Sequence, residues 1–203
     1  MQASLTFPKL LGQCVSGGSR DGSDEQLIAR IAAGDRRAMD TLYRRHHVRV
    51  YRFLLRLMKD AANAEDLTSD VFIDVWREAR RFEGRSQVST WMLAIARHKA
   101  FRALRRRVND RLDDEMLANI PDDADRADVV IEKQRQSGVL QHGLMQLSPT
   151  HREVIDLVYY HGKSIAEVAE ITDAPQATVK TRIHYARKRL AELVTAQRLD
   201  AAA

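Results

Sequence analysis

Apolar residues recur at helical spacing through the first half of the chain, and turn residues separate the runs. Ser23 and Gln26 form a capping box, after which a short apolar stretch defines a helix that ends at Gly34. Three longer amphipathic patterns predict helices over about 36–58, 64–81 and 89–107. The run 82–87 breaks the periodicity and predicts a loop. Four helices with short connections indicate a compact bundle.

The second half of the chain carries a tighter series of helix starts and turns. Ser148 with Pro149 predicts the start of one helix. Ser164 and Glu167 form a second capping box that opens a short helix, and residues 172–175 predict a tight turn. The last helix keeps one apolar face, formed by Val179, Ile183, Ala186 and Leu190. This is the helix-turn-helix pattern, and no strand signal of comparable quality is present, so we expect an all-α fold.

Charge is segregated along the chain, although the totals nearly balance. The 203 residues include 33 Lys and Arg against 28 Asp and Glu, a net charge of +5. Basic stretches at 35–59, 97–108 and 178–190 flank an acidic stretch at 109–128, a pattern that indicates two small cationic helical domains on an acidic linker. The expected division is a flexible tail over 1–22, a four-helix domain over 23–108, an acidic linker over 109–136, a helix-turn-helix domain over 137–198 and a tail over 199–203.

Composition excludes several classes of protein. Apolar residues form 44% of the chain, enough for a core, which argues against wholesale disorder. The lone Cys14 supports neither an intramolecular disulfide nor a multi-cysteine zinc site, and it fits a cytoplasmic protein. No run approaches the roughly 18 apolar residues of a membrane helix, so no membrane insertion is expected. Residues 11–14 resemble a lipoprotein cleavage site only faintly, and we do not expect export.

The exposed face of the last helix has the chemistry of a recognition helix. Opposite its apolar face lie Thr181, Tyr185 and Lys188, with His184 beside them and further cations on both flanks. Polar side chains there suit base edges, while the flanking cations suit phosphates on the groove walls. The alternative is a solvated charged helix. The capping box, the turn and the apolar face together favour DNA binding.

Two further helix faces carry a functional pattern. Near the fourth helix, Trp91 lies among cations, a combination that suits single-stranded nucleic acid, although Trp91 alone is more typical of a core residue. On the third helix, Asp66, Asp70 and Asp74 recur every fourth residue beside Leu67. Such an acidic ridge repels DNA and suits a cationic protein face, while a merely solvated helix face is an equal alternative.

Three segments of the chain, within about residues 24–193, resemble bacterial sigma factors of the extracytoplasmic-function (ECF) group. Residues 64–72 with Trp76 resemble the helix of that family that binds core RNA polymerase. Residues 82–84, 89–91 and 95–97 resemble its −10 recognition and melting segment. Residues 147–149, 152–154 and 164–189 resemble its −35-binding domain. Single pieces are weakly specific, but all three in this order and spacing are strongly so.

The resemblance implies an ECF sigma factor that binds core RNA polymerase and promoter DNA and directs transcription initiation. It implies sigma region 2 in the first domain and sigma region 4 in the second, an anti-sigma partner, and no cofactor, metal or enzymatic activity. The implied polymerase-binding residues, which would dock on the clamp coiled coil of the largest subunit, are Asp66, Leu67, Asp70, Val71 and Asp74. The implied −10 residues are Gly84, Arg85, Ser86, Trp91, His98, Lys99 and Arg102. The implied −35 residues are Ala177, Thr178, Lys180, Thr181, Arg182, His184, Tyr185 and Lys188.

Two departures from the family pattern limit what the resemblance carries over. Ala177 stands where the family often has Gly, and Tyr185 where Arg is common, so a promoter sequence is not transferred. A free-standing helix-turn-helix regulator is the alternative function, and it predicts a self-complementary apolar patch on the first domain. An enzyme acting on nucleic acid is a third alternative, but the sequence shows no clustered carboxylate, His or Cys set for it.

Overall fold

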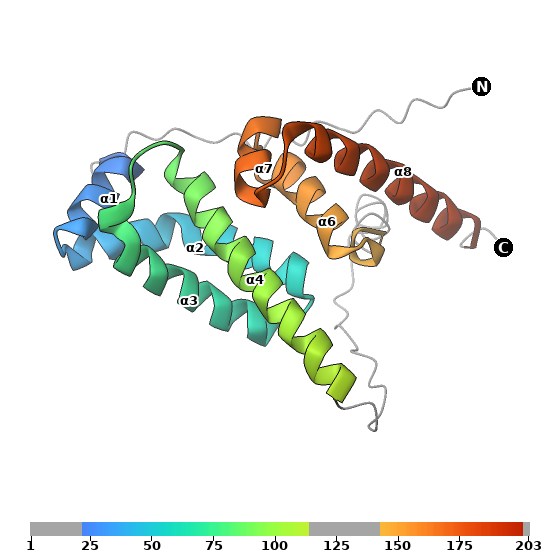
Figure 1. Cartoon of the computed structure of the whole chain (residues 1–203), viewed down its shortest axis with the longest axis horizontal. Helices are drawn as coiled ribbons and strands as arrows, with labels where there is room; N and C mark the ends of the chain where they lie inside the picture. Colours follow the sequence, from blue (N-terminus) through green and yellow to red (C-terminus); the bar gives the residue numbers. More distant parts are fainter. Residues whose placement is uncertain (1–21, 114–142, 201–203) are drawn as a thin grey trace, which may run out of the picture.

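A computed structural model describes residues 22–113 and 143–200, with side chains placed over 22–106 and 143–196. This part of the chain is helical and contains no strand (Figure 1). The first domain consists of α1 (Asp24–Ala32), α2 (Arg36–Met58), α3 (Ala61–Glu78), the 3₁₀ turn η1 (Ala79–Arg81) and α4 (Val88–Asp113). The second domain consists of α6 (Pro149–Ile155), the π-helical turn η2 (Asp156–Tyr160), α7 (Ile165–Thr172) and α8 (Gln176–Asp200).

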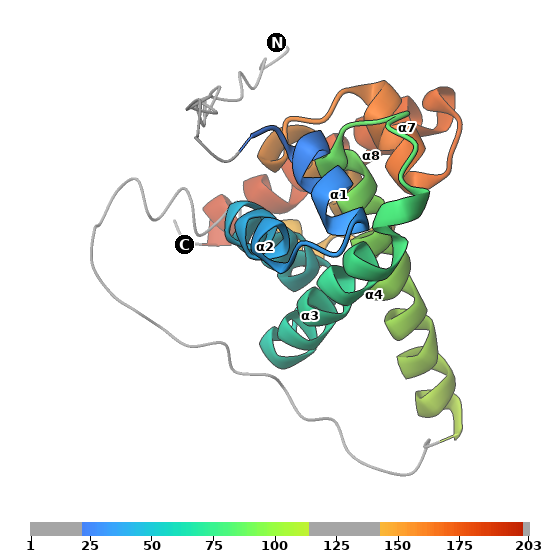
Figure 2. The ribbon, with the colours of Figure 1, turned by 90° about the vertical axis from the view of Figure 1, so that its left-hand side faces the viewer.

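The first domain is the expected four-helix bundle, and its first helix begins at the expected cap. The Ser23 hydroxyl accepts from the backbone N–H of Gln26, whose side chain accepts from the Ser23 N–H, so the capping box is confirmed. Asp35 caps α2 by accepting from two backbone N–H groups, those of Arg37 and Ala38. The bundle, seen end-on in Figure 2, packs around large buried side chains, among them Leu27, Leu42, Phe53, Leu54, Leu57, Val71, Val75, Met92 and Leu93.

An ion-pair cluster joins α1 to α2. His46 Nε2 lies 2.6 Å from one carboxylate oxygen of Asp24, and Arg45 Nη1 donates to the other over 3.0 Å. The hydrogen bond from His46, followed by the interactions with Arg45, outweighs burial and lowers the pKa of Asp24. The N-terminal helix is therefore held to the bundle by charge as well as by its apolar face.

The second domain is the expected helix-turn-helix. The Ser148 hydroxyl caps α6 with Pro149 at its first position, and Ser164 forms a capping box with Glu167 at the start of α7. Asp173 takes a left-handed conformation at the turn, with a φ of 47°. The apolar face of α8 is largely buried, because Val179, Ala186 and Leu190 are at most 2% exposed.

The structure differs from the sequence-based expectation at three helix ends, the first being α3, which begins at Ala61 rather than near residue 64. Helix α4 extends to Asp113 rather than ending near residue 107, and the helix after Ser148 changes to a π-helical turn at η2. The expected N-terminal tail with Cys14, most of the acidic linker and the last residues lie outside the described residues.

The two domains pack against each other. Helix α7 lies against the start of α4, and α6 lies against the end of α2 (Figures 1 and 2). Buried apolar residues of both domains belong to one continuous cluster. The sequence predicts two domains whose separation the linker does not fix, whereas the structure holds them in a closed arrangement. We call the contact surface between them the seam.

Candidate nucleic-acid and protein interfaces

Helix α8 presents the expected polar face to solvent. Tyr185 is 55% exposed, and its ring meets the His184 ring edge-on at 5.6 Å. The Thr181 hydroxyl donates to the Ala177 carbonyl at 3.0 Å, so this side chain is oriented by its own helix. Of the predicted −35 set, the exposed members are Ala177, Lys180, Thr181, His184, Tyr185 and Lys188, and Thr178 is half-buried. This face has the shape and charge that a major groove accepts.

Arg182 is the exception among the predicted −35 residues. Its side chain is 31% exposed, and its Nη1 lies 3.9 Å from Oε1 of the buried Glu153 on α6. The guanidinium therefore faces α6 rather than the exposed face of the recognition helix.

The predicted −10 loop is a short exposed segment braced by an aromatic pair. Gly84 has a φ of +69° and open space around its Cα, so its backbone conformation rather than lack of room favours glycine there. Arg85 is exposed and pairs with Glu83. Trp91 is half-buried, with its ring 5.0 Å from that of Phe82. Trp91 thus packs at the base of the loop, as its alternative core assignment requires.

The cationic face of α4 keeps some of its predicted members but not Lys99. His98 and Arg102 are exposed. The Lys99 side chain is only 18% exposed, and its Nζ lies 2.7 Å from Asp74 Oδ2 and 3.8 Å from Asp70 Oδ2. Lys99 therefore faces α3, away from the exposed cations of its own helix.

The acidic ridge of α3 is present, but it is more apolar than expected. Asp66 and Asp70 are exposed, Asp74 and Leu67 are half-buried, and Val71 is fully buried, so Val71 supports the ridge from within the core. The surface also exposes Ile73 (46%) and Trp76 (38%). Acidic groups beside exposed apolar side chains are typical of a protein-binding surface.

The sequence analysis missed a polar cluster that joins the two domains across the seam. The Lys163 ammonium donates to Gln87 Oε1 (3.2 Å), Ser89 Oγ (2.9 Å) and Thr90 Oγ1 (2.7 Å), and also to Glu167 Oε1 (2.8 Å). Thr90 in turn donates to Glu167 over 2.9 Å. Burial opposes ionisation of Glu167, but the bonds from Lys163, Ser164 and Thr90 outweigh it and lower its pKa to about 2.

A second cluster centres on a fully buried carboxylate. Glu153 Oε2 accepts from Arg97 Nε of α4 at 2.8 Å. Burial raises the pKa of Glu153, while Arg97 and Arg182 oppose the rise. In the sequence, the only sign of burial for Glu153 was its place, with Arg152, directly before the apolar residues 154–155 of a capped helix.

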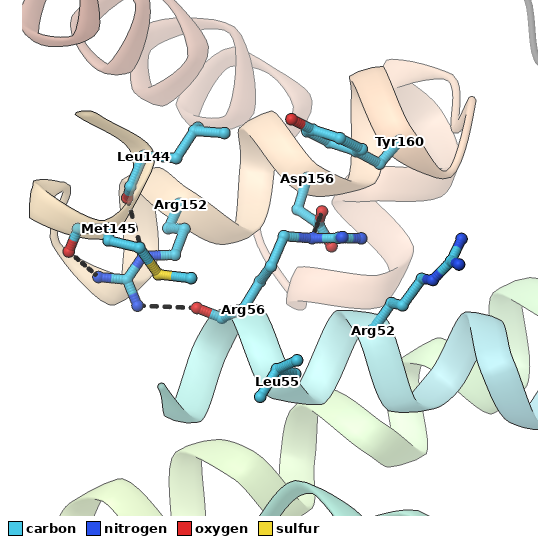
Figure 3. A pocket seen from close by; sticks show the side chains of 8 residues that line it. All are labelled: Arg52, Leu55, Arg56, Leu144, Met145, Arg152, Asp156 and Tyr160. Atoms are coloured by element: carbon cyan, nitrogen blue, oxygen red, sulfur yellow. Dashed lines mark hydrogen bonds and ion pairs between the residues drawn. The ribbon is translucent and has the colours of Figure 1, made fainter. Parts of the chain in front are cut away.

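Arg152 is 2% exposed and closes the seam from the other side. It donates to three carbonyls of its own domain, those of Leu144, Met145 and Leu147, and to the carbonyls of Arg56 and Leu57 at the end of α2. Burial lowers the pKa of Arg152 to about 10. Beside it, Arg56 pairs with Asp156 and lies under the Tyr160 ring, at the edge of a cavity of about 260 Å³ (Figure 3).

Two kinds of site are not found in the described ranges. No group of three or more His, Cys, Asp or Glu residues is arranged there to hold a metal ion. None of the helices described there combines the length and apolar character that a membrane crossing needs.

Comparison with known protein families identifies both domains. The sigma-70 region 2 model matches residues 42–109, and the sigma-70 region 4 model matches residues 137–190. The ECF RNA polymerase sigma factor SigM of Mycobacterium tuberculosis is 31% identical over 192 residues, which cover 93% of this chain and 94% of that protein. SigK of Mycobacterium bovis is 29% identical over 181 residues, or 87% of this chain and 96% of that protein.

Solved structures share the fold. The sigma factor RpoE of Bartonella quintana, in complex with the anti-sigma factor NepR, matches with a TM-score of 0.63 and 23% identity over 77% of this chain and 96% of that one. CnrH, in complex with the cytosolic domain of CnrY, matches with a TM-score of 0.64 and 24% identity over 86% and 99%. The two matched family models, together with a match to SigM at 31% identity over nearly the full length of the chain, show that the chain belongs to the ECF family of RNA polymerase sigma factors.

Proposed function

We propose that this protein recruits core RNA polymerase to promoters through three separate surfaces. The protein is an ECF sigma factor and acts in promoter-directed transcription initiation. The observation that best supports this division of labour is the recognition helix, whose apolar face is buried while Lys180, Thr181 and Tyr185 face solvent. The matches to both sigma regions do not favour a free-standing regulator.

The second domain would read the −35 element as duplex DNA. Exposed cations on α8 would pair with phosphates, a contribution to binding that weakens as salt rises. Thr181, His184 and Tyr185 lie between these cations and are placed to reach base edges. Arg182 would contribute to DNA contact only if it left Glu153.

The first domain would hold the unpaired −10 strand. The exposed loop with Gly84 and Arg85 leads into α4, where His98 and Arg102 are exposed. A flipped base bound in that loop would offset the few kcal/mol that unstacking costs. Trp91 and Lys99 would support this surface, since one braces the loop and the other pairs with α3.

The ridge of α3 would bind the clamp coiled coil of the largest polymerase subunit. Asp66 and Asp70 supply charge, and Ile73 and Trp76 supply apolar contact area. Because the polymerase is cytoplasmic, we place the protein there, as a binding subunit rather than an enzyme. The solved structures RpoE–NepR and CnrH–CnrY support an anti-sigma partner for this chain as well.

Reconstitution with purified core polymerase tests the proposal. We expect the full chain to form promoter-specific open complexes with core enzyme and to bind DNA weakly alone. The matched control is Arg44→Gln, which removes an exposed α2 cation outside the three proposed surfaces. Tight, palindrome-specific DNA binding without polymerase would overturn the proposal in favour of a regulator.

A further inference from the structure

We propose that the seam is a reversible latch, in which each second-domain carboxylate that bonds to the first domain keeps a second hydrogen-bonding or ionic partner within its own domain. The closed latch covers Thr90 and engages Gln87 and Ser89 next to the −10 loop. The proposed consequence, that a closed chain withholds these side chains from the single strand, rests on the proposed function. Three carboxylates carry the argument, one in each part of the seam.

The first carboxylate is Glu167. It accepts from Thr90 across the seam at 2.9 Å and from Lys163, four residues earlier on its own domain, at 2.8 Å. When the domains separate, Lys163 and Glu167 leave together as a pair. The groups that lose their partner on the first domain are an amide and two hydroxyls, which water can solvate without a charge being left buried.

The second carboxylate is Glu153, which is 0% exposed. Its Oε2 accepts from Arg97 across the seam, while Oε1 lies 3.9 Å from Arg182 Nη1 of its own domain. Neither of those last two atoms has a hydrogen-bond partner among the described residues. Loss of Arg97 therefore leaves Glu153 with a nearby cation whose donor is free to bond it. After separation, the Arg97 guanidinium would still lie over the Phe101 ring of its own helix, 4.7 Å from the ring centroid.

The third carboxylate is Asp156, which is 2% exposed. It pairs with Arg56 of α2 across the seam (Figure 3) and with His161 Nε2 of its own domain at 3.1 Å. The His161 ring also packs edge-on against Phe53 of the first domain at 5.5 Å. Separation would remove Arg56 and Phe53 but leave the Asp156–His161 contact in place.

This duplication lowers the electrostatic cost of opening the seam. Breaking a buried ion pair is usually strongly destabilising because one charge is left buried and unpaired. Here each carboxylate retains a partner in its own domain, so separation leaves none of the three without a hydrogen-bonding or ionic contact. The bonds from Arg152 to Arg56 and Leu57 behave likewise, since three carbonyls of its own domain still hold the guanidinium.

What the latch covers follows from the same contacts. Thr90 is 0% exposed in the closed arrangement, although it lies in the first turn of α4, next to the exposed loop. Its hydroxyl and that of Ser89 both accept from the Lys163 ammonium of the other domain. A strand that used these polar groups would have to displace Lys163, so strand binding and closure exclude each other.

The rate of thiol alkylation at position 90 measures opening directly. We would place Thr90→Cys in a Cys14→Ser background and compare the parent with Arg97→Gln and with Arg105→Gln. Arg105 lies on the same helix but bonds its own Phe101 carbonyl. Loss of a hydrogen bond to a charged group should raise the open fraction, and with it the alkylation rate, about tenfold or more in Arg97→Gln. The Arg105→Gln rate should match the parent, and equal rates in all three would overturn the latch.

A double-mutant cycle tests whether Arg182 serves as the second partner of Glu153 when Arg97 is lost. Arg97→Gln and Arg182→Gln should each leave the second domain folded in thermal unfolding followed by circular dichroism. The double variant should be destabilised by far more than the sum of the two single effects, because Glu153 then has no cation. If Arg97→Gln alone destabilised that domain as much as the double variant does, the duplication would have no effect and the proposal would fail.

Addition of core polymerase separates this proposal from the proposed function. The alkylation ratios and the cycle involve neither polymerase nor DNA. If they come out as expected but polymerase neither binds nor raises the alkylation rate, the latch stands and the proposed function fails. If polymerase binds but the ratios are equal, the proposed function stands and the latch fails.

Discussion

Lys99 Nζ lies 2.7 Å from Asp74 Oδ2, which joins a residue predicted to bind −10 DNA to the ridge predicted to bind polymerase. The contact crosses from α4 to α3, and the Lys99 side chain is mostly buried in it. Before the strand could use this ammonium, the acidic ridge would have to release it.

Replacement of Lys99 tests which of the two roles dominates. Lys99→Met keeps the aliphatic stem and removes the charge, so we expect the free energy of unfolding to fall by roughly 0.5–1 kcal/mol, as for a partly exposed pair. Urea unfolding measures this, with Arg105→Met on the same helix as the control. Unchanged stability combined with weakened strand binding would assign Lys99 to DNA instead.

Charge reversal on the ridge should remove polymerase binding without unfolding the bundle. In Asp66→Lys/Asp70→Lys, two exposed carboxylates become cations facing a cationic partner, which repels rather than attracts. Affinity for core polymerase and the circular dichroism spectrum are measured together. Retained affinity in a folded variant would remove the ridge from the interface, and Glu65→Lys, an exposed neighbour on the same helix, shows the effect of added charge alone.

The exposed face of α8 should set −35 preference. Thr181→Ala or Tyr185→Ala should change the discrimination between −35 sequences by roughly 1–3 kcal/mol for each base edge that the side chain no longer reaches. Binding of holoenzyme to a panel of single-base promoter variants measures it. Equally weakened binding across the panel would mean that these residues contact phosphates.

Arg152 should be essential for stability. Removal of its side chain leaves five carbonyls without their donor, two of them at the end of α2, so Arg152→Met should cost roughly 3 kcal/mol or more. Arg152→Lys keeps the charge but not the planar fan of donors, and it should restore only part of that stability. Chemical unfolding of both variants decides this, and near wild-type stability of Arg152→Lys would show that charge alone suffices.

Acid should destabilise the protein through Glu167 and Asp24. The pKa of each is lowered in the folded state, to about 2 for Glu167 from an ordinary 4.5. The contribution of each is therefore complete above its unfolded pKa and is lost as pH falls below that value, which for Glu167 means from about 4.5 toward 2. Burial raises the pKa of Glu153, so protonation of this carboxyl favours the folded state and partly offsets the loss of stability in acid. The unfolding midpoint followed against pH should fall less steeply in Glu167→Gln, and an unchanged slope would contradict the assignment.

The parts of the fold that the sequence predicted are those specified by neighbouring residues. The capping boxes of Ser23 and Ser164 involve partners three residues away, and the turn before α8 lies within a few residues. These signals suffice for the helix-turn-helix and most helix bounds. The apolar face of α8 was likewise predicted from its spacing, because burial on one side of a helix is visible as periodicity.

The parts that were missed depend on contacts far apart in the chain. Glu153 finds Arg97 across 56 residues, and Arg152 finds the Arg56 carbonyl across 96. In the sequence both are charges next to an apolar run, which indicates burial without naming a partner. The same holds for Lys99, which lies among cations in the sequence but pairs across helices in the structure. The predicted assignments of individual residues to polymerase, −10 and −35 DNA stay predictions.

The bonds from Arg152 to the Arg56 and Leu57 carbonyls make the final turn of α2 sensitive to an event elsewhere. If the second domain moves away, water replaces Arg152 at those two carbonyls, and the last turn of α2 frays more readily than in the closed arrangement. Amide hydrogen exchange over residues 55–59 would then speed up while the middle of α2 stays protected. Exchange at the end of α2 would thereby report, without any label, when the two domains come apart.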